Sequence, residues 1–382
     1  MFRAQQQFIT QDLAQKMVFL TGPRQVGKTY LAQEIAKGFQ KSVYLNYDYF
    51  EDRDIIKNAG WLLDTELLIL DELHKMQGWK NYLKGVYDTK PRNLKIIVTG
   101  SARLDMLRRS GDSMAGRFFT HRLNPLSLVE IPENAEKNLE RLLSRGGFPE
   151  PYLAETDEEA NRWRMQYIDG LIRNDILDFE KVHDFKAIQL TLEMLRQRVG
   201  SPLSFSSLAR DIHCAPNTIR RYVEIFEALF IIFRVTPYHR NIARSLLKEP
   251  KIYFYDTGMI KGDEGIRFEN LVACSLLKHL NAIEDYEGRR AEVKYLRTKE
   301  KKEVDFALVV EDRPITLVET KLSDATVSPT LKYFNRKYGF PAVQVIKNLR
   351  QERISDSVEL RKGVNFLKTL KFGNRDFFHN LK

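Results

Sequence analysis

The sequence predicts an α/β fold made of several modules, and two observations support this prediction. Residues 17–123 alternate short apolar segments with helical stretches, the pattern of a parallel sheet covered by helices on both faces. A second strand-rich segment begins near Gly265, after a helical region with breakers at Gly146, Gly147 and Pro149. A length of 382 residues is enough for two or three domains.

Changes of pattern place the boundaries. Apolar strands are expected at 17–21, 42–46, 67–70, 95–99 and 118–123, which gives an α/β domain over 1–130. A helical lid or connector is expected over 131–190, and short helices followed by a hairpin over 191–262. A second α/β domain with a basic tail is expected over 263–382.

Composition favours a cytoplasmic protein. The hydrophobic fraction of 43% and charged fraction of 29% are ordinary for a globular chain. The longest apolar stretch, 226–235, contains Glu227 and is too short to span a membrane, and the N-terminus lacks the apolar region of a secretory signal. Cys214 and Cys274 suggest neither a disulfide framework nor a zinc site.

The positive charge is concentrated at the C-terminal end. Residues 331–382 hold twelve Lys and Arg against four Asp and Glu, most of the net charge of +10. Such an asymmetry is expected for a partner rich in phosphate, because cations near phosphates release condensed counterions. The alternative interpretation is a solvated basic surface.

A glycine-rich segment directly follows the first predicted strand. Its pattern is G-x-x-x-x-G-K-T, the Walker A motif, and its residues are Gly22, Pro23, Arg24, Gln25, Val26, Gly27, Lys28 and Thr29. Between a strand and a helix, this loop presents backbone N–H groups to a polyphosphate. Lys28 is expected to reach the β and γ phosphates, and Thr29 to ligate Mg²⁺. The sequence therefore predicts a site for ATP and Mg²⁺.

A second apolar strand ends in two carboxylates, Asp71 and Glu72, the pattern of a Walker B motif. The carboxyl end of a buried parallel strand faces the phosphates, so Asp71 is expected to hold Mg²⁺ and Glu72 to polarise the attacking water. The alternative is a core strand followed by an acidic helix cap.

Two further residues are candidates for the same site. Ser101 follows the strand at 95–99 and would place a hydroxyl beside the γ phosphate if this strand lies between the first two. Arg117 follows a loop at 110–113 and is a candidate arginine finger on a neighbouring subunit's nucleotide. The alternative for Arg117 is a plain surface arginine.

Together these segments resemble a known family. The runs GPRQVGKT, ILDE, TGS and AGR…LNPLS are similar to the AAA-type bacterial and archaeal ATPases that carry a C-terminal domain of uncharacterised function, DUF4143. The resemblance covers nearly the whole chain, and segments 146–149 and 173–176 resemble those that follow the ATPase core. It implies an AAA+-like P-loop sheet and self-assembly into a homo-oligomer.

The middle module has helix-turn-helix spacing. A helix over 204–212 and a second beginning at Pro216 are followed by strands at 230–235 and 251–255, so the unit resembles a winged helix. In a DNA reader, four residues at the start of the second helix would face bases or phosphates: Asn217, Thr218, Arg220 and Arg221. The alternative is a surface for protein contacts.

The C-terminal module resembles a restriction-like nuclease. Asp305, Glu319 and Lys321 match the D…(D/E)-x-K pattern on two adjacent strands. If residues 310 and 314 are opposed across a three-residue loop, Asp305 falls opposite Glu319, and Glu269 on a preceding helix completes the carboxylates. Such a cluster suits Mg²⁺ and phosphodiester hydrolysis. The alternative is a charged hairpin.

The motifs together predict an Mg²⁺-dependent ATPase coupled to DNA binding and to DNA cleavage by the C-terminal domain. The competing hypothesis is a nucleotide-dependent switch whose C-terminal modules bind protein partners without nuclease activity.

Overall fold

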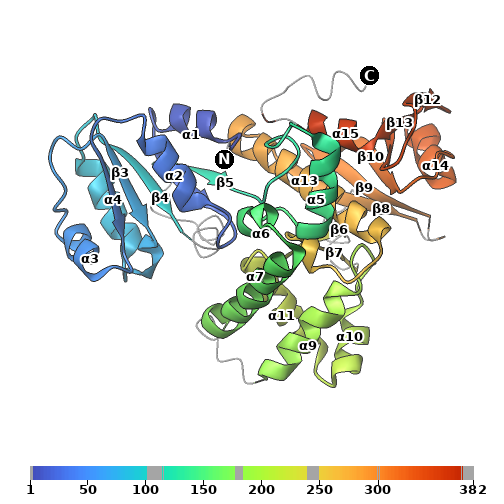
Figure 1. Cartoon of the computed structure of the whole chain (residues 1–382), viewed down its shortest axis with the longest axis horizontal. Coiled ribbons are helices and arrows are strands. Elements are labelled where there is room, and N and C mark those ends of the chain that lie inside the picture. The colour runs from blue at the N-terminus through green and yellow to red at the C-terminus, as the bar shows by residue number, and fades with distance from the viewer. Residues whose placement is uncertain are drawn as a thin grey trace. The chain divides into compact units, whose positions relative to one another are not determined.

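The computed structural model describes residues 3–100, 114, 116–176, 184–238, 249–298, 300, 302–370 and 372, the side chains of 174–176 excepted. The chain forms two compact units, Met1–Asn124 and Pro125–Lys382 (Figure 1). Among the described residues, no helix is long and apolar enough to cross a membrane.

The first unit is built on a five-stranded parallel sheet in the order β2-β3-β4-β1-β5. Its strands are β1 (Met17–Thr21), β2 (Ser42–Asn46), β3 (Leu67–Asp71), β4 (Lys95–Thr99) and β5 (Phe118–Arg122). The helices are α1 (Gln6–Asp12), α2 (Lys28–Ala36), α3 (Phe50–Lys57), the short η1 (Leu73–Lys75) and α4 (Trp79–Thr89). The predicted α/β fold is confirmed, and all five predicted strands are present.

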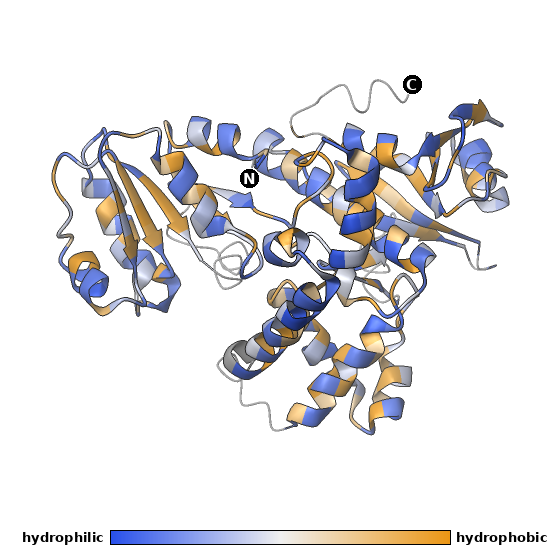
Figure 2. Cartoon of the chain, viewed as in Figure 1, coloured by the Kyte–Doolittle hydropathy of each residue, from blue (hydrophilic) through white to orange (hydrophobic). Residues whose placement is uncertain are grey.

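Continuous burial explains why three of these strands are apolar throughout. Every residue of β1 and β3, and all of β4 except Lys95, is buried, as expected for strands covered on both faces. One core joins Leu68, Val98, Ile56 and Leu83, so strands β3 and β4 pack against helices α3 and α4. Figure 2 shows these strands in orange.

The second unit opens with helices and ends in a mixed sheet. The helices before the sheet are α5 (Ala135–Arg145), α6 (Pro149–Leu153), α7 (Asp157–Gly170), η3 (Leu171–Ile176), α9 (Phe185–Arg196), α10 (Phe205–Ile212) and α11 (Pro216–Ala228). The sheet has eight strands in the order β12-β13-β11-β10-β9-β8-β6-β7.

The strands are β6 (Ile232–Pro237), β7 (Lys251–Phe254), β8 (Ala291–Arg297), β9 (Glu303–Val310), β10 (Arg313–Lys321), β11 (Ala342–Ile346), β12 (Arg353–Ser355) and β13 (Val358–Lys362). Between and after them come η4 (Thr257–Met259), α13 (Glu264–Glu287), α14 (Pro329–Tyr338) and α15 (Gly363–Thr369). Long α13 packs against β7, β8, β9 and β10, which fixes its first turns beside those strands (Figure 1).

The hairpin expected as a wing is part of this sheet. β6 and β7 pair antiparallel, as a wing requires, but β6 also pairs parallel with β8 through Thr236 and Lys294. The expected boundary between 262 and 263 therefore crosses one continuous sheet.

A tight turn at Gly146 shows why the segment after α5 needs glycine. Gly146 has φ of 75°, and a Cβ there would lie 1.5 Å from Oδ1 of Asp256. Asp256 is buried and forms an ion pair with Arg164 of α7, with Nε and Oδ2 3.3 Å apart. Any side chain at 146 would displace this pair, so the glycine is required by packing as well as by φ.

Candidate functional site

The glycine-rich loop lies at the carboxyl end of β1, directly before α2. Gly22 has φ of 143°, and a Cβ there would lie 2.3 Å from the carbonyl oxygen of Leu123. Only glycine lets the loop pass so close to the chain that follows β5. The loop thus begins as the Walker A pattern predicts, between a strand and a helix.

Lys28 is the first residue of α2 and is buried beneath the loop. Its Nζ donates to the carbonyl oxygens of Gly22, at 3.0 Å, and Pro23, at 2.7 Å. Burial lowers the pKa of Lys28 from 10.5 to about 8, although the carboxylates of Glu72 and Asp71 oppose this effect. The ammonium is therefore charged at neutral pH, and a phosphate would replace the two carbonyl oxygens as a stronger partner.

Asp71, at the carboxyl end of β3, accepts hydrogen bonds from four donors at this site. Its Oδ2 accepts from Oγ1 of Thr29, at 2.8 Å, and from the hydroxyl of Tyr44, at 2.7 Å. Its Oδ1 accepts from Oγ1 of Thr99 and from the backbone N–H of Glu72, at 3.0 Å. Four donors around one carboxylate hold it in a fixed orientation beside the glycine-rich loop.

Glu72 occupies a strained backbone conformation directly after β3. Its φ is 54°, an uncommon value for a residue with a side chain, and such strain is often found at functional sites. Burial is the main cause that raises the pKa of its carboxyl, with Asp71 adding to it, while Lys75 opposes both. The Nζ of Lys75 lies 3.8 Å from Oε2. A carboxylate with a raised pKa is a better proton acceptor for water.

Ser101 was expected beside the γ phosphate if its strand lies between the strands of the Walker A and Walker B motifs. Strand β4 does lie between β1 and β3. Ser101 itself lies outside the described residues, so its role stays a prediction. From β4 itself, the hydroxyl that donates to Asp71 is that of Thr99, the last residue of the strand. We did not expect Thr99 or Tyr44; the available signal was a hydroxyl at the carboxyl end of β4 for Thr99, and for Tyr44 only a tyrosine in the middle of β2.

Arg117 lies at the opposite edge of the sheet from the glycine-rich loop. It directly precedes β5, and its carbonyl oxygen accepts from the N–H of Met17, at the start of β1. Its guanidinium contacts the carboxylate of Asp88 at 2.8 and 3.1 Å. Arg117 therefore does not contribute to the site of its own chain, and a role on a neighbouring subunit stays a prediction.

The residues at the first site fit Mg²⁺, the ion that usually accompanies ATP. Thr29 Oγ1 and Asp71 Oδ2 already touch, and they are the hydroxyl and carboxylate that a magnesium ion takes from a P-loop protein.

The expected carboxylate pair in the second unit lies on the β9–β10 hairpin, with one correction to the turn. Val310 pairs with Arg313, not with residue 314, because Glu311 and Asp312 both adopt positive φ and form a two-residue turn. A bulge between Pro314 and Thr316 then shifts the register by one residue.

After the bulge, Phe306 pairs with Val318, and one further step along the two strands brings Asp305 to Glu319. Asp305 and Glu319 thus lie opposite each other as expected, but through a two-residue turn and a bulge instead of a three-residue loop. Thr320, between Glu319 and Lys321, donates to Oδ2 of Asp305 from its N–H and its hydroxyl, both at 2.9 Å.

Lys251 of β7 supplies a cation to this cluster, which sequence reasoning missed. Its Nζ lies 2.8 Å from Glu303, 3.8 Å from Asp305 and 4.0 Å from Glu269, and its side chain is 2% exposed. Burial lowers its pKa, but the three carboxylates outweigh burial, so the net shift is upward and the ammonium stays charged. The signal in the sequence was a lysine at the head of the apolar run Ile-Tyr-Phe.

Asn270 explains why β7 lies beside α13. Its side-chain amide accepts from the N–H of Phe254, at 2.8 Å, and donates to the carbonyl oxygen of Phe254, at 2.9 Å. The neighbouring Glu269 accepts from the hydroxyl of Tyr253 at 2.7 Å. Hydrogen bonds at Asn270 and Glu269 thus join the first turns of α13 to the end of β7.

Two carboxyls of the cluster hold protons more tightly than usual. Burial raises the pKa of Glu269 from 4.5 to about 8, and the charge of Asp305 adds to this. Burial and Asp305 likewise raise the pKa of Glu319 from 4.5 to about 7, although Lys321, at 3.1 Å, opposes them. Carboxyls crowded at this spacing cannot all ionise without a compensating cation.

The residues fit a magnesium ion in part. Oε2 of Glu319 is buried and has no hydrogen-bond partner in the described part of the chain, and such an oxygen is stabilised by a cation or a proton. Glu269, by contrast, is held by Tyr253 and Lys251. Over the described residues, no group of three or more His, Cys, Asp or Glu side chains is arranged to hold a metal. The metal roles of Asp305, Glu319 and Glu269 stay predictions.

The predicted helix pair is present as α10 and α11. Ser204 caps α10 by accepting from the N–H of Ser207, and Pro216 occupies the first turn of α11. Asn217, Arg220 and Arg221 are exposed on α11. Thr218 is half-buried, and the expected contact face stays a prediction.

The chain matches three family models. Residues 14–132 match the one described as "AAA domain", residues 136–265 "Domain of unknown function (DUF8612)", and residues 264–363 "Domain of unknown function (DUF4143)".

Among relatives, an uncharacterized protein of Mycobacterium tuberculosis is 26% identical over 330 residues, covering 83% of this chain and 73% of that protein. An uncharacterized protein of Methanocaldococcus jannaschii is 22% identical over 377 residues, covering 89% and 81%. A solved Walker-type ATPase of Pyrococcus abyssi has 14% identity and a TM-score of 0.45, covering 69% of this chain and 94% of that one.

Proposed function

We propose that this chain, which carries an AAA domain followed by a DUF4143 domain, is an Mg²⁺-dependent ATP hydrolase whose second unit acts on DNA. The observation that carries the first part is the position of Asp71, which holds the hydroxyls of Thr29 and Thr99 beside the glycine-rich loop. A fixed carboxylate next to a phosphate cradle is what nucleotide hydrolysis requires.

In this proposal each residue of the first site has one task. Lys28 leaves the carbonyl oxygens of Gly22 and Pro23 and binds the terminal phosphates. Thr29 and Asp71 hold Mg²⁺, which, when bound, neutralises charge on the phosphate oxygens. Glu72, with its raised pKa, orients the attacking water and accepts its proton.

The test is ATP turnover by the purified chain and two variants. We expect Glu72→Gln to lower kcat by roughly 100-fold or more while ATP still binds, because only the water-activating group is lost. Lys28→Ala should lose both binding and turnover. Glu34→Gln, which alters a carboxylate paired with Lys37 on α2, is the matched control and should behave as wild type. Turnover by Glu72→Gln within threefold of wild type contradicts the assignment.

The DNA-directed part of the proposal rests on the second unit. Helix α13, which carries Glu269, precedes the β9–β10 hairpin, as in the restriction-like nucleases that this module resembles. Asp305, Glu319 and Lys321 lie together there, and the unpartnered oxygen of Glu319 supports a cation at this place. In the cleavage hypothesis the two carboxylates bind the metal and Lys321 stabilises charge on the phosphate.

Incubation with single- and double-stranded DNA, with Mg²⁺ or Mn²⁺ and with or without ATP, tests this part on a gel. Wild type should cut and Asp305→Asn, purified in parallel, should not. Equal inertness of the two proteins rules out cleavage and leaves the ATPase assignment untouched.

Self-assembly is the third part of the proposal. An arginine finger acts on a neighbour, so Arg117→Ala should lower turnover only where chains assemble, and mixing it with Lys28→Ala should restore some activity. In a mixed assembly, the intact Arg117 of the Lys28→Ala subunit would face the intact nucleotide site. No recovery on mixing contradicts the role.

One observation favours the nucleotide-dependent switch as a second candidate. Lys251 already neutralises part of the carboxylate cluster without a metal, which a purely structural or protein-binding module would also need. A chain that hydrolyses ATP but has no salt-sensitive affinity for DNA would support the switch.

A further inference from the structure

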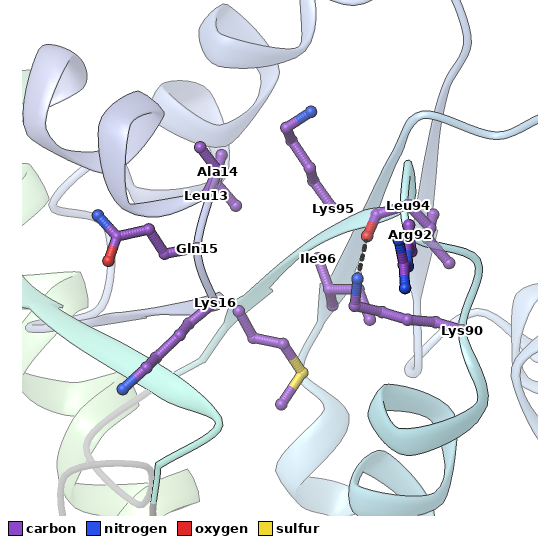
Figure 3. Close-up of a pocket in the computed structure, with 10 residues that line it drawn as sticks. Leu13, Ala14, Gln15, Lys16, Lys90, Arg92, Leu94, Lys95 and Ile96 are labelled. Atoms are coloured by element: carbon purple, nitrogen blue, oxygen red, sulfur yellow. Dashed lines mark hydrogen bonds between the residues drawn. The ribbon is translucent and has the colours of Figure 1, made fainter.

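The first unit has a cavity at the sheet edge opposite the glycine-rich loop. It measures about 410 Å³ and lies between the segment that enters β1 and the segment that enters β4 (Figure 3). Strands β1 and β4 are each five residues long, so the cavity and the nucleotide site are roughly 15 Å apart along the same strands. The cavity is therefore distinct from the ATP site.

Four of the ten lining side chains are cations and none is an anion. The cations are Lys16, Lys90, Arg92 and Lys95. The apolar part of the lining is Leu13, Met17, Leu94 and Ile96, all of them buried. We call the four buried apolar side chains the floor of the cavity and the four cations its rim.

Among the described residues, these cations have no carboxylate partner, unlike neighbouring lysines. Lys37 and Lys41 of the same unit form ion pairs with Glu34 and Asp64. Within the described part of the chain, no carboxylate lies within 4.0 Å of any of the four cations at the cavity.

Their contacts are instead to carbonyls and rings. Lys90 donates to the carbonyl oxygen of Leu94 at 2.7 Å, and Lys16 lies over the ring of Phe119, 4.6 Å from its centroid. Burial lowers the pKa of Lys90, and the neighbouring charge of Lys95 lowers it further. Like charges kept together around a hollow repel one another, and a bound anion removes that repulsion.

We propose that this cavity binds a small phosphorylated molecule of about the size of a mononucleotide. The volume is in the range of ligand-binding pockets and exceeds what an inorganic anion needs. The rim cations suit a phosphate group, and the aliphatic floor suits an apolar ring attached to it. Such a site goes beyond the proposed ATP hydrolysis, because it would sense a second phosphorylated molecule.

Lysine acylation followed by peptide mass spectrometry tests the proposal on the whole chain. Each lysine reports separately, so Lys16 and Lys90 report on the cavity, Lys28 on the ATP site, and exposed Lys57 on reagent strength. The probes are adenosine monophosphate, inorganic pyrophosphate and a 20-nucleotide single-stranded DNA. We expect adenosine monophosphate to slow acylation of Lys16 and Lys90 at least threefold and pyrophosphate to slow it less, with Lys57 unchanged.

Two double variants of equal charge provide the control. Arg92→Gln with Lys95→Gln should abolish the protection of Lys16 and Lys90, whereas Lys37→Gln with Lys84→Gln, which leaves Lys57 as the reference, should retain it. ATP turnover and protection of Lys28 by ATP should remain within twofold of wild type in both, which shows that the unit is folded and separates this proposal from the ATPase assignment.

Three results overturn the proposal: no protection of Lys16 and Lys90 by either small probe, protection that survives in the Arg92 and Lys95 variant, or protection by the DNA alone. The last result would reassign the four cations to nucleic-acid backbone binding.

Discussion

Replacing Glu269 with glutamine measures how strongly the carboxylate cluster of the second unit resists ionisation. The folded pKa of about 8 exceeds the ordinary value of 4.5 by about 3.5, and each pKa unit corresponds to about 1.4 kcal/mol. The upper bound is therefore roughly 5 kcal/mol. Because the side chain is 21% exposed and water screens part of the field, we expect about half of this, roughly 2–3 kcal/mol.

The sign follows from linkage between protonation and folding. A carboxyl whose folded pKa is raised binds its proton more tightly in the folded state, so its stabilisation is complete below pH 4.5. That stabilisation is lost as pH rises toward 8, where the folded state must also ionise. Glutamine does not titrate and keeps an oxygen for the hydroxyl of Tyr253. The stability of Glu269→Gln relative to wild type should therefore rise by about 2–3 kcal/mol between pH 5 and pH 8.5.

Urea denaturation at several pH values measures this difference. Trp61→Phe and Trp79→Phe leave Trp163 as the single tryptophan, so its fluorescence reports on the second unit alone. Glu352→Gln is the control, because burial there is outweighed by hydrogen bonds such as that from the N–H of Lys362, and the net pKa shift is downward. Its offset should stay constant over this range. A difference for Glu269→Gln that is flat to within about 0.5 kcal/mol refutes the reasoning.

Three further predictions concern packing and hydrogen bonds. Gly22→Ala forces a Cβ to 2.3 Å from the carbonyl oxygen of Leu123. Thermal denaturation should therefore show a loss of about 2 kcal/mol or more in folding stability, and ATP affinity should fall at least tenfold. An unchanged midpoint of thermal denaturation contradicts the close approach. Tyr44→Phe removes one donor to the Asp71 carboxylate. The Mg²⁺ concentration for half-maximal turnover should then rise roughly three- to tenfold. An unchanged concentration counts against a role of Tyr44 in orienting Asp71. Lys278→Met leaves the buried carboxylate of Glu130 without the ammonium that it pairs with. Urea denaturation should show a loss of about 3–5 kcal/mol in folding stability, and adding Glu130→Gln should restore part of it. No recovery in the double variant contradicts a direct pair.

The elements that carry the first candidate site could be located from the sequence because their geometry is local. The loop from Gly22 to Thr29 and the strand ending at Asp71 are each continuous in the chain, and parallel strands bring their carboxyl ends to one edge of the sheet. Tyr44 and Thr99 were missed because a single hydroxyl within or at the end of a strand has no distinctive spacing. Their contact with Asp71 exists only once β2 and β4 flank β3.

The second site was predicted less completely because its members come from separate strands. Asp305 and Glu319 share a hairpin, so alternation and register could place them opposite each other. Lys251 precedes Glu303 by a long stretch of chain and reaches it only because β7 joins the same sheet through β6 and packs on α13. Pattern analysis grouped that hairpin with the helices before it, where its pairing with β8 cannot be seen.

The shared sheet also limits how this protein can be divided. A fragment that begins at Glu264, where the DUF4143 match starts, lacks β6 and β7 and therefore leaves β8 as an uncovered edge strand. It also removes Lys251 and the hydroxyl of Tyr253 from carboxyls that are buried beside them. The C-terminal domain therefore cannot be cut at its sequence boundary without loss. Expressed alone, it would expose an unpaired strand edge and leave Glu303 and Asp305 without the ammonium of Lys251.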